Sequence, residues 1–94
     1  MATVMVMEWP EVTKEQYEQV RREVKWETDV PSGAKFHVAW FGDDGLHVLD
    51  LWDSAEQFQE FAATRLTPAT QRLGIQGQPH VQFAEAQAIF APNV

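Results

Sequence analysis

The sequence predicts an α+β fold in the order strand, helix, strand, strand, helix, strand, with both helices covering one face of a four-stranded antiparallel sheet. Capping boxes at Thr13 and Ser54 mark the starts of two helices. The run Gly-Asp-Asp-Gly folds residues 34–53 into a hairpin, and the last apolar run, His80–Phe90, follows a proline and is predicted to be the fourth strand. A chain of 94 residues can bury one core, so residues 1–94 are expected to form a single domain.

The first half of the chain is predicted to contain one strand and one helix. The strand, Thr3–Trp9, is rich in β-branched and bulky residues and ends at Pro10. The helix begins after Thr13 and ends near Lys25, which leaves Trp26 to cover an edge of the core. The inward-facing residues of this helix keep helical spacing: Tyr17, Val20 and Val24.

The hairpin of residues 34–53 is apolar on both of its faces. One face carries Phe36, Val38, Trp40, Leu49 and Leu51. The opposite face carries Ala39, Phe41, Leu46, Val48 and Trp52. Two helices can bury only one face of a sheet, so a second copy of the chain is expected to cover the other face in a homodimer.

The second helix is predicted to start at Ser54 and to pass a proline. Pro68 removes a backbone hydrogen bond, so a kink or break is expected near Leu66, with Thr67 capping a second segment that stops at Gly74. The apolar residues of this region are Phe58, Phe61, Ala62, Leu66, Ala69 and Leu73.

Composition excludes several classes of function. Fourteen acidic and seven basic residues give a net charge of -7, which repels nucleic acid and anionic membranes. No cysteine is present, and the three histidines lack the spacing of a helical zinc pair, so a structural metal site is not expected. The apolar start, Met1–Met7, runs into Glu8 and Pro10 and is read as a strand rather than a signal peptide, which makes the cytoplasm the expected location.

The hairpin also contains the candidate catalytic pair, His37 and Asp50. If the turn is centred on Asp43 and Asp44, these two residues lie directly opposite each other, with Cβ atoms about 4.5–5.5 Å apart. A carboxylate in that position orients the imidazole, which can then act as a base. A register shifted by two residues would place His37 opposite Trp52 instead, and a polar pair at a sheet margin is the structural alternative.

Three aromatic residues are candidates for a substrate-binding wall beside this pair: Trp52, Tyr17 and Phe58. Core packing is the alternative role for each of them. His47 falls on the other face of the hairpin, where the dimer interface is expected. Nucleophile elbows and phosphate-binding loops do not occur in the sequence, so hydrolase and kinase functions have no support.

The segment Gly45–Phe61, GLHVLDLWDSAEQFQEF, resembles the third strand and second helix of the antibiotic biosynthesis monooxygenase-like family. The shared features are an acidic residue, a Trp two residues later and a buried aromatic in the helix, here Asp50, Trp52 and Phe58. The resemblance implies a ferredoxin-like βαββαβ fold, two subunits forming a dimeric α/β barrel, and a pocket lined by Trp52. Ala62 stands where haem-degrading members carry a histidine ligand, and this departs from their pattern.

Together these features predict a homodimeric, cofactor-independent enzyme that acts on an apolar aromatic or polyketide-like small molecule. His37 would remove a proton, Asp50 would orient His37, and Trp52, Phe58 and Tyr17 would line the pocket. Oxygenation or cyclisation would follow. The alternative function is a non-catalytic, ligand-binding or structural homodimer of the same fold.

Overall fold

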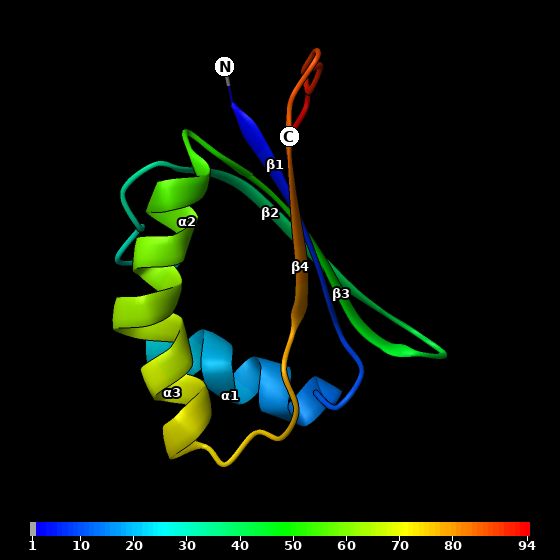
Figure 1. Ribbon diagram of the computed structural model, residues 1–94, viewed down its shortest axis with the longest axis vertical. Coiled ribbons are helices and arrows are strands. Elements are labelled where there is room, and N and C mark those ends of the chain that lie inside the picture. Colours follow the sequence, from blue (N-terminus) through cyan, green and yellow to red (C-terminus); the bar gives the residue numbers. More distant parts are fainter. Residues whose placement is uncertain (1) are drawn as a thin grey trace.

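The computed structural model describes residues 2–94. Met1, the first residue of the apolar start Met1–Met7, lies outside the described residues. The predicted order of elements is confirmed, and the four strands form one antiparallel sheet in the order β2-β3-β1-β4 (Figure 1). The elements are β1 (Thr3–Trp9), α1 (Lys14–Val24), β2 (Ala34–Gly42), β3 (Gly45–Trp52), α2 (Ala55–Phe61), the π-helical turn η1 (Ala62–Leu66), α3 (Thr67–Arg72) and β4 (His80–Glu85).

The hairpin of β2 and β3 has the register that a turn at Asp43 and Asp44 predicts. Phe41 pairs with Leu46, and His37 pairs with Asp50. The alternative register, with His37 opposite Trp52, is therefore wrong. Side chains alternate along a strand, so this pairing sends His37, Asp50 and Trp52 to the same face of the sheet.

The helices lie on that same face, and the core fills the space between them and the sheet (Figure 1). Alternate residues of β3 are buried on the helix side, from Leu46 to Trp52, as the hairpin pattern predicts. Other core side chains come from β1, α1 and α2: Met5, Met7, Trp9, Val20, Val24, Phe58 and Phe61. None of the helices within residues 2–94 has the length and apolar composition that crossing a bilayer requires.

The other face of the β2–β3 hairpin carries the second apolar set, and none of the helices within the described residues 2–94 lies over it (Figure 1). Val38 is 40% exposed and Trp40 is 46% exposed on this face. We call the surface formed by Phe36, Val38, Trp40, Leu49 and Leu51 the open face.

The first helix starts as predicted, while the second helix has only half of its predicted capping box. At Thr13 the box is complete, because the Thr13 side chain accepts from the Gln16 amide and the Gln16 side chain accepts from the Thr13 amide. At Ser54 the hydroxyl accepts from the Gln57 amide at 3.2 Å, but it also donates to the Gln57 side chain at 3.1 Å. That contact takes the place of the return bond to the backbone.

The predicted break near Leu66 is replaced by the π-helical turn η1, and the helical path continues from α2 into α3 (Figure 1). The amide of Thr67 donates to the carbonyl of Ala62, five residues earlier. A widened turn accommodates Pro68, which has no amide proton and crowds the preceding turn. The predicted cap at Thr67 is wrong, because Thr67 has helical φ and ψ and belongs to α3.

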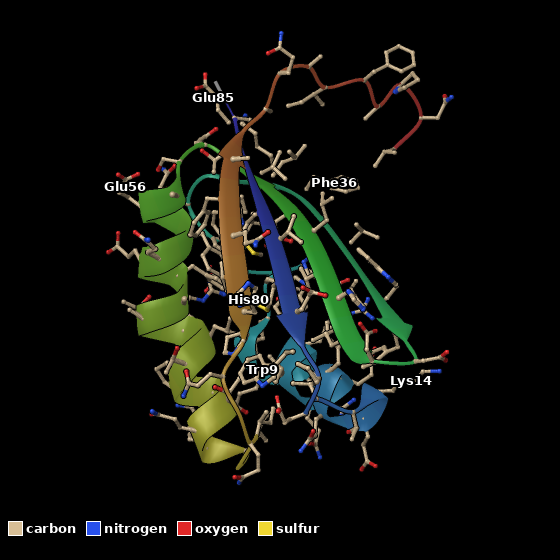
Figure 2. The ribbon with its side chains drawn as sticks, turned by 45° about the vertical axis from the view of Figure 1, so that its right-hand side comes forward. Trp9, Lys14, Phe36, Glu56, His80 and Glu85 are labelled. Carbon is tan, nitrogen blue, oxygen red and sulfur yellow. The ribbon has the colours of Figure 1, made fainter. Side chains whose placement is uncertain are left out.

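The last strand is shorter than the predicted His80–Phe90 and ends at Glu85. Its pairing partner is β1, whose first residue, Thr3, lies opposite Glu85, and one further bond joins the Ala86 amide to the Ala2 carbonyl. Beyond Glu85 the chain leaves the strand and runs toward the side of the sheet where Phe36 lies (Figure 2). Residues 86–94 share a hollow there with Phe36, Leu49 and Leu51.

The hairpin depends on the glycine that directly follows its turn, Gly45, and this dependence can be measured. Gly45 has φ +105°, and a Cβ there would lie 2.6 Å from the backbone of Pro10. Gly74 also has positive φ, +70°, but open space around it. We expect Gly74→Ala to lower the free energy of unfolding by about 1–2 kcal/mol. Gly45→Ala should cost about 1–3 kcal/mol more, because the overpacking adds to the strain. Chemical denaturation measures both, and equal losses would contradict the close approach of Pro10.

Candidate functional site

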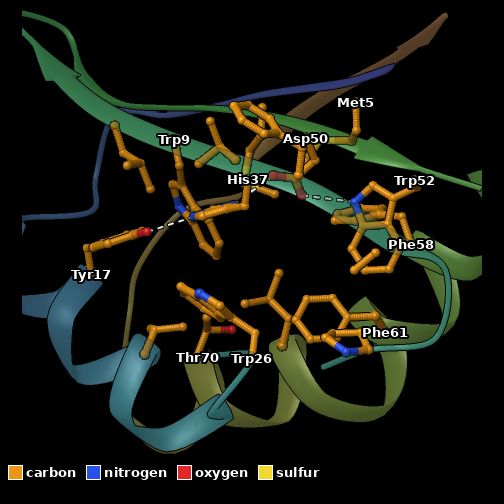
Figure 3. A pocket seen from close by; sticks show the side chains of 18 of the residues that line it. Met5, Trp9, Tyr17, Trp26, His37, Asp50, Trp52, Phe58, Phe61 and Thr70 are labelled. Atoms are coloured by element: carbon orange, nitrogen blue, oxygen red, sulfur yellow. Dashed lines mark hydrogen bonds and ion pairs between the residues drawn. The ribbon is translucent and has the colours of Figure 1, made fainter. Parts of the chain in front are cut away.

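A cavity of about 230 Å³ lies between the sheet and the helices (Figure 3). Its walls are mostly apolar and aromatic, and its polar groups are few. The aromatic lining includes Trp9, Trp26, Trp52, Phe58 and Phe61. The side chains of Tyr17, His37 and Asp50 also line it. A concave apolar space with a few convergent polar groups is the usual form of a small-molecule site.

Asp50 is the buried polar centre of this site. The residue is 6% exposed, and its two carboxylate oxygens have different partners (Figure 3). The indole Nε1 of Trp52 donates to Oδ2 at 3.0 Å, and Nδ1 of His37 lies 2.7 Å from Oδ1. Each oxygen of the carboxylate therefore has a hydrogen-bond partner, which offsets the cost of burying it.

These contacts determine the tautomer of His37. An ionised carboxylate only accepts hydrogen bonds, so the Nδ1–H of His37 donates to Asp50. The Nε2 atom of a neutral His37 then carries the lone pair. The structure brings His37 and Asp50 together as the sequence predicts, in the geometry that a base and its orienting group require.

Tyr17 contacts this pair from α1, and the sequence did not predict the contact. Its hydroxyl donates to Nε2 of His37 at 2.7 Å (Figure 3). The result is a continuous series of hydrogen bonds from Tyr17 through His37 and Asp50 to Trp52. The helical spacing of the sequence predicts that Tyr17 faces inward, but that spacing contains no information on which residue of β2 it meets.

The environment keeps the phenol of Tyr17 protonated. Burial raises the pKa of Tyr17 to about 12, and the negative charges of Glu18, Asp50 and Glu27 add to this effect. The positive charge of Arg21 acts in the opposite direction. At neutral pH the hydroxyl is therefore a hydrogen-bond donor, in agreement with its position against the lone pair of His37.

Aromatic side chains enclose the two ends of the hydrogen-bonded series. Trp26 packs against His37, with ring centroids 5.1 Å apart, and against Tyr17 at 5.9 Å. Trp52 packs edge-on against Phe58 at 5.6 Å and contacts Phe61 at 5.5 Å. Trp52, Phe58 and Tyr17 thus lie around the cavity, where the sequence analysis placed the wall, and Trp26 and Phe61 are additional wall residues.

His47 lies on the opposite face of the hairpin, as the sequence predicts. Its ring stacks on Trp40, and its Nε2 lies 2.6 Å from Asp44, while Nδ1 lies 3.6 Å from Glu8. The hydrogen bond from His47 holds the pKa of Asp44 below its usual value. Within residues 2–94 these three side chains are the one group with metal-ligand spacing. Both ring nitrogens already face carboxylates, so a metal would have to displace one of those contacts.

The arrangement of a βαββαβ chain with its helices on one side of the sheet defines the ferredoxin-like fold, and comparison with solved structures agrees. No protein-family model and no curated protein matches the sequence. The chain is structurally similar to NE2512, a protein of unknown function from Nitrosomonas europaea, with TM-score 0.65 and 14% identity over 99% of this chain and 95% of that chain.

Two further similar structures are oxygenases. One is a variant of SnoaB, a cofactor-independent oxygenase from Streptomyces nogalater, with TM-score 0.63 and 14% identity over 94% of each chain. The other is the ActVA-Orf6 monooxygenase of Streptomyces coelicolor in complex with nanaomycin D, with TM-score 0.58 and 17% identity over 98% of this chain and 92% of that chain. These similarities confirm the predicted fold and its resemblance to antibiotic biosynthesis monooxygenase-like structures.

The protonation of Tyr17 can be measured directly, because this residue is the one tyrosine of the chain. We expect the phenol of the folded protein to titrate with a pKa of about 12 in an ultraviolet absorbance titration. In the urea-denatured chain it should titrate near about 10. The pKa is raised in the folded state, so its contribution to stability is complete below about pH 10 and is lost as the pH rises toward about 12. A folded-state value near that of the denatured chain would contradict the partial burial of the hydroxyl.

Proposed function

We propose that this chain is a cofactor-independent small-molecule enzyme that removes a proton from an apolar aromatic or polyketide-like substrate. The observation that carries the proposal is the His37–Asp50 pair, which borders an apolar cavity and is held there by Trp52. His37 is the base, and Asp50 fixes its tautomer. Oxygenation or cyclisation of the resulting anion completes the reaction.

The environment of the pair suits this chemistry. Proton transfer to His37 creates an imidazolium, and the carboxylate of Asp50, 2.7 Å away, stabilises that positive charge. The burial of Asp50, which is 6% exposed, strengthens this attraction. The substrate anion then reacts with molecular oxygen or attacks an electrophilic carbon of its own skeleton.

The size of the cavity favours a compact substrate. Pockets for drug-sized ligands have volumes of about 300–1,000 Å³. An apolar cavity of about 150 Å³ holds a single benzene ring. The cavity here, about 230 Å³, lies between these values. It therefore favours a planar compound of one or two rings.

Support for an oxygenase also comes from the similar structures. SnoaB is described as a cofactor-independent oxygenase, and ActVA-Orf6 as a monooxygenase that binds nanaomycin D. A cofactor-independent oxygenase needs a base that ionises the substrate, and the His37–Asp50 pair can supply one.

We also propose that the chain forms a homodimer through the open face. Its apolar side chains have no helix over them, and Trp40 is 46% exposed. Exposed apolar patches of this kind mark association surfaces. A second copy placed face to face would bury both open faces and leave both cavities on the outer, helix-covered sides.

A hydrogen-exchange experiment tests the role of His37. The probe is 2-tetralone, a two-ring ketone with acidic hydrogens beside its carbonyl, incubated without oxygen in deuterated buffer. We expect the protein to accelerate loss of these hydrogens, as measured by proton NMR. His37→Gln should lower the rate by about 100-fold or more, because Gln keeps a polar contact but cannot act as a base.

His47→Gln is the matched control. His47 is also hydrogen-bonded to a carboxylate of the same hairpin, but it lies on the opposite face. We expect its exchange rate to equal that of the wild type. Wild-type exchange at the buffer rate, or undiminished exchange in His37→Gln, would contradict the proposed function and favour the non-catalytic alternative.

The dimer is tested by sedimentation at micromolar concentration. We expect a species of twice the chain mass of 10.7 kDa. Trp40→Glu should shift the protein toward the monomer, because it places a charge within the proposed apolar interface. Gln59→Glu, at an exposed position of α2, is the control that should leave the mass unchanged. A folded wild-type monomer would contradict the dimer.

A further inference from the structure

The basic nitrogen of His37 is not open to a substrate in this structure. Nδ1 contacts Asp50, and Nε2 accepts the hydroxyl proton of Tyr17 at 2.7 Å. Both nitrogens of the ring therefore have partners. The Tyr17 hydroxyl thus occupies the lone pair of Nε2, which is the position that a substrate proton would have to take (Figure 3).

The geometry of this contact is suited to proton transfer. The rings of Tyr17 and His37 are within 3° of parallel. The lone pair of Nε2 lies in the plane of the imidazole, so a phenol in nearly the same orientation can direct its O–H along that lone pair. A hydroxyl that donates one hydrogen bond retains two acceptor lone pairs, which are available to a group in the cavity.

We propose that the hydroxyl oxygen of Tyr17 takes the proton from the substrate, while Tyr17 passes its own proton to Nε2 of His37. This inference rests on the proposed function and changes the role of Tyr17 from pocket wall to catalytic residue. The substrate C–H bond breaks, and its electron pair stays on carbon. A new O–H bond forms on Tyr17, and a new N–H bond forms on His37, which becomes an imidazolium beside Asp50.

The transfer leaves Tyr17 neutral at the start and at the end. This matters because its surroundings disfavour a phenolate: the side chain is partly buried, and Glu18, Glu27 and Asp50 all lie near enough to oppose a negative charge. The positive charge of Arg21 favours a phenolate, but its guanidinium is engaged by Glu27 at 2.6 Å. Because Tyr17 gains one proton while it loses another, no phenolate forms.

The same surroundings stabilise the product of the transfer. The imidazolium of His37 would lie 2.7 Å from the Asp50 carboxylate and would face the ring of Trp26, whose centroid is 5.1 Å away. The two rings are tilted by 53°, and a cation within about 6 Å of an indole is attracted to the extent that it lies over the ring face. The positive charge thus forms between the Asp50 carboxylate and the Trp26 ring.

The 2-tetralone exchange experiment separates this inference from the proposed function. Tyr17→Phe keeps the ring and removes only the hydroxyl. We expect it to lower kcat by about 100-fold or more with little change in KM, because the hydroxyl acts in the transfer and not in binding. The double variant with His37→Gln should be no slower than the slower single variant, since the two groups act as one unit.

Phe41→Leu is the matched control for packing. Phe41 lies edge-on to Tyr17, with centroids 6.2 Å apart, so this substitution loosens the support of Tyr17 but leaves its hydroxyl. We expect the kcat of Phe41→Leu to stay within about threefold of the wild-type value. This change is much smaller than the decrease that follows removal of an acid–base group. An equal decrease of kcat in Phe41→Leu and Tyr17→Phe would overturn the inference, because the effect would then come from the position of the Tyr17 ring and not from its hydroxyl.

The remaining outcomes are also distinct. If Tyr17→Phe exchanges as fast as the wild type, or faster, while His37→Gln is slow, then His37 acts directly and the inference is wrong, although the proposed function stands. If His37→Gln retains the wild-type rate, both fail.

Discussion

The hydrogen bonds to the buried carboxylate of Asp50 are the interaction on which the site depends. A carboxylate in an apolar core is stable only when its oxygens have donors. Trp52 supplies one donor from the same strand, two residues away, and His37 supplies the other from across the hairpin. Pairing in this register is therefore both a structural requirement and the origin of a defined histidine tautomer. The same hydrogen bond that satisfies Asp50 also orients His37.

The rest of the chain is arranged around the two faces of that hairpin. The face with Asp50 receives the helices, and α1 brings Tyr17 against His37 while α2 brings Phe58 against Trp52. The opposite face keeps an apolar surface that includes Trp40, which lies near the hairpin turn and stacks on His47. One strand pair thus separates the proposed chemistry from the proposed association, because alternate residues of a strand point to opposite sides.

The parts of this structure that sequence reasoning predicted are those decided by local chemistry. The Gly-Asp-Asp-Gly turn and the alternation of β3 determine the register, and the register places His37 opposite Asp50. The contact of Tyr17 with His37 could not be predicted, since it depends on how α1 lies over the sheet. The end of β4 depends on the length of β1, and the π-helical turn depends on how a continuous helix accommodates Pro68. The Tyr17–His37 contact and the end of β4 depend on residues far away in the sequence. The π-helical turn depends on the helix that continues on both sides of it.

The most direct test of this account is the tautomer of His37, measured at neutral pH by nitrogen NMR of the labelled imidazole. The account predicts a proton on Nδ1, held by Asp50, and an Nε2 atom with the chemical shift of an unprotonated acceptor. Asp50→Asn should remove this preference, because an amide no longer requires a donor from Nδ1. A neutral ring protonated on Nε2 in the wild type would contradict the account, because His37 would then present no lone pair to Tyr17 or to any substrate.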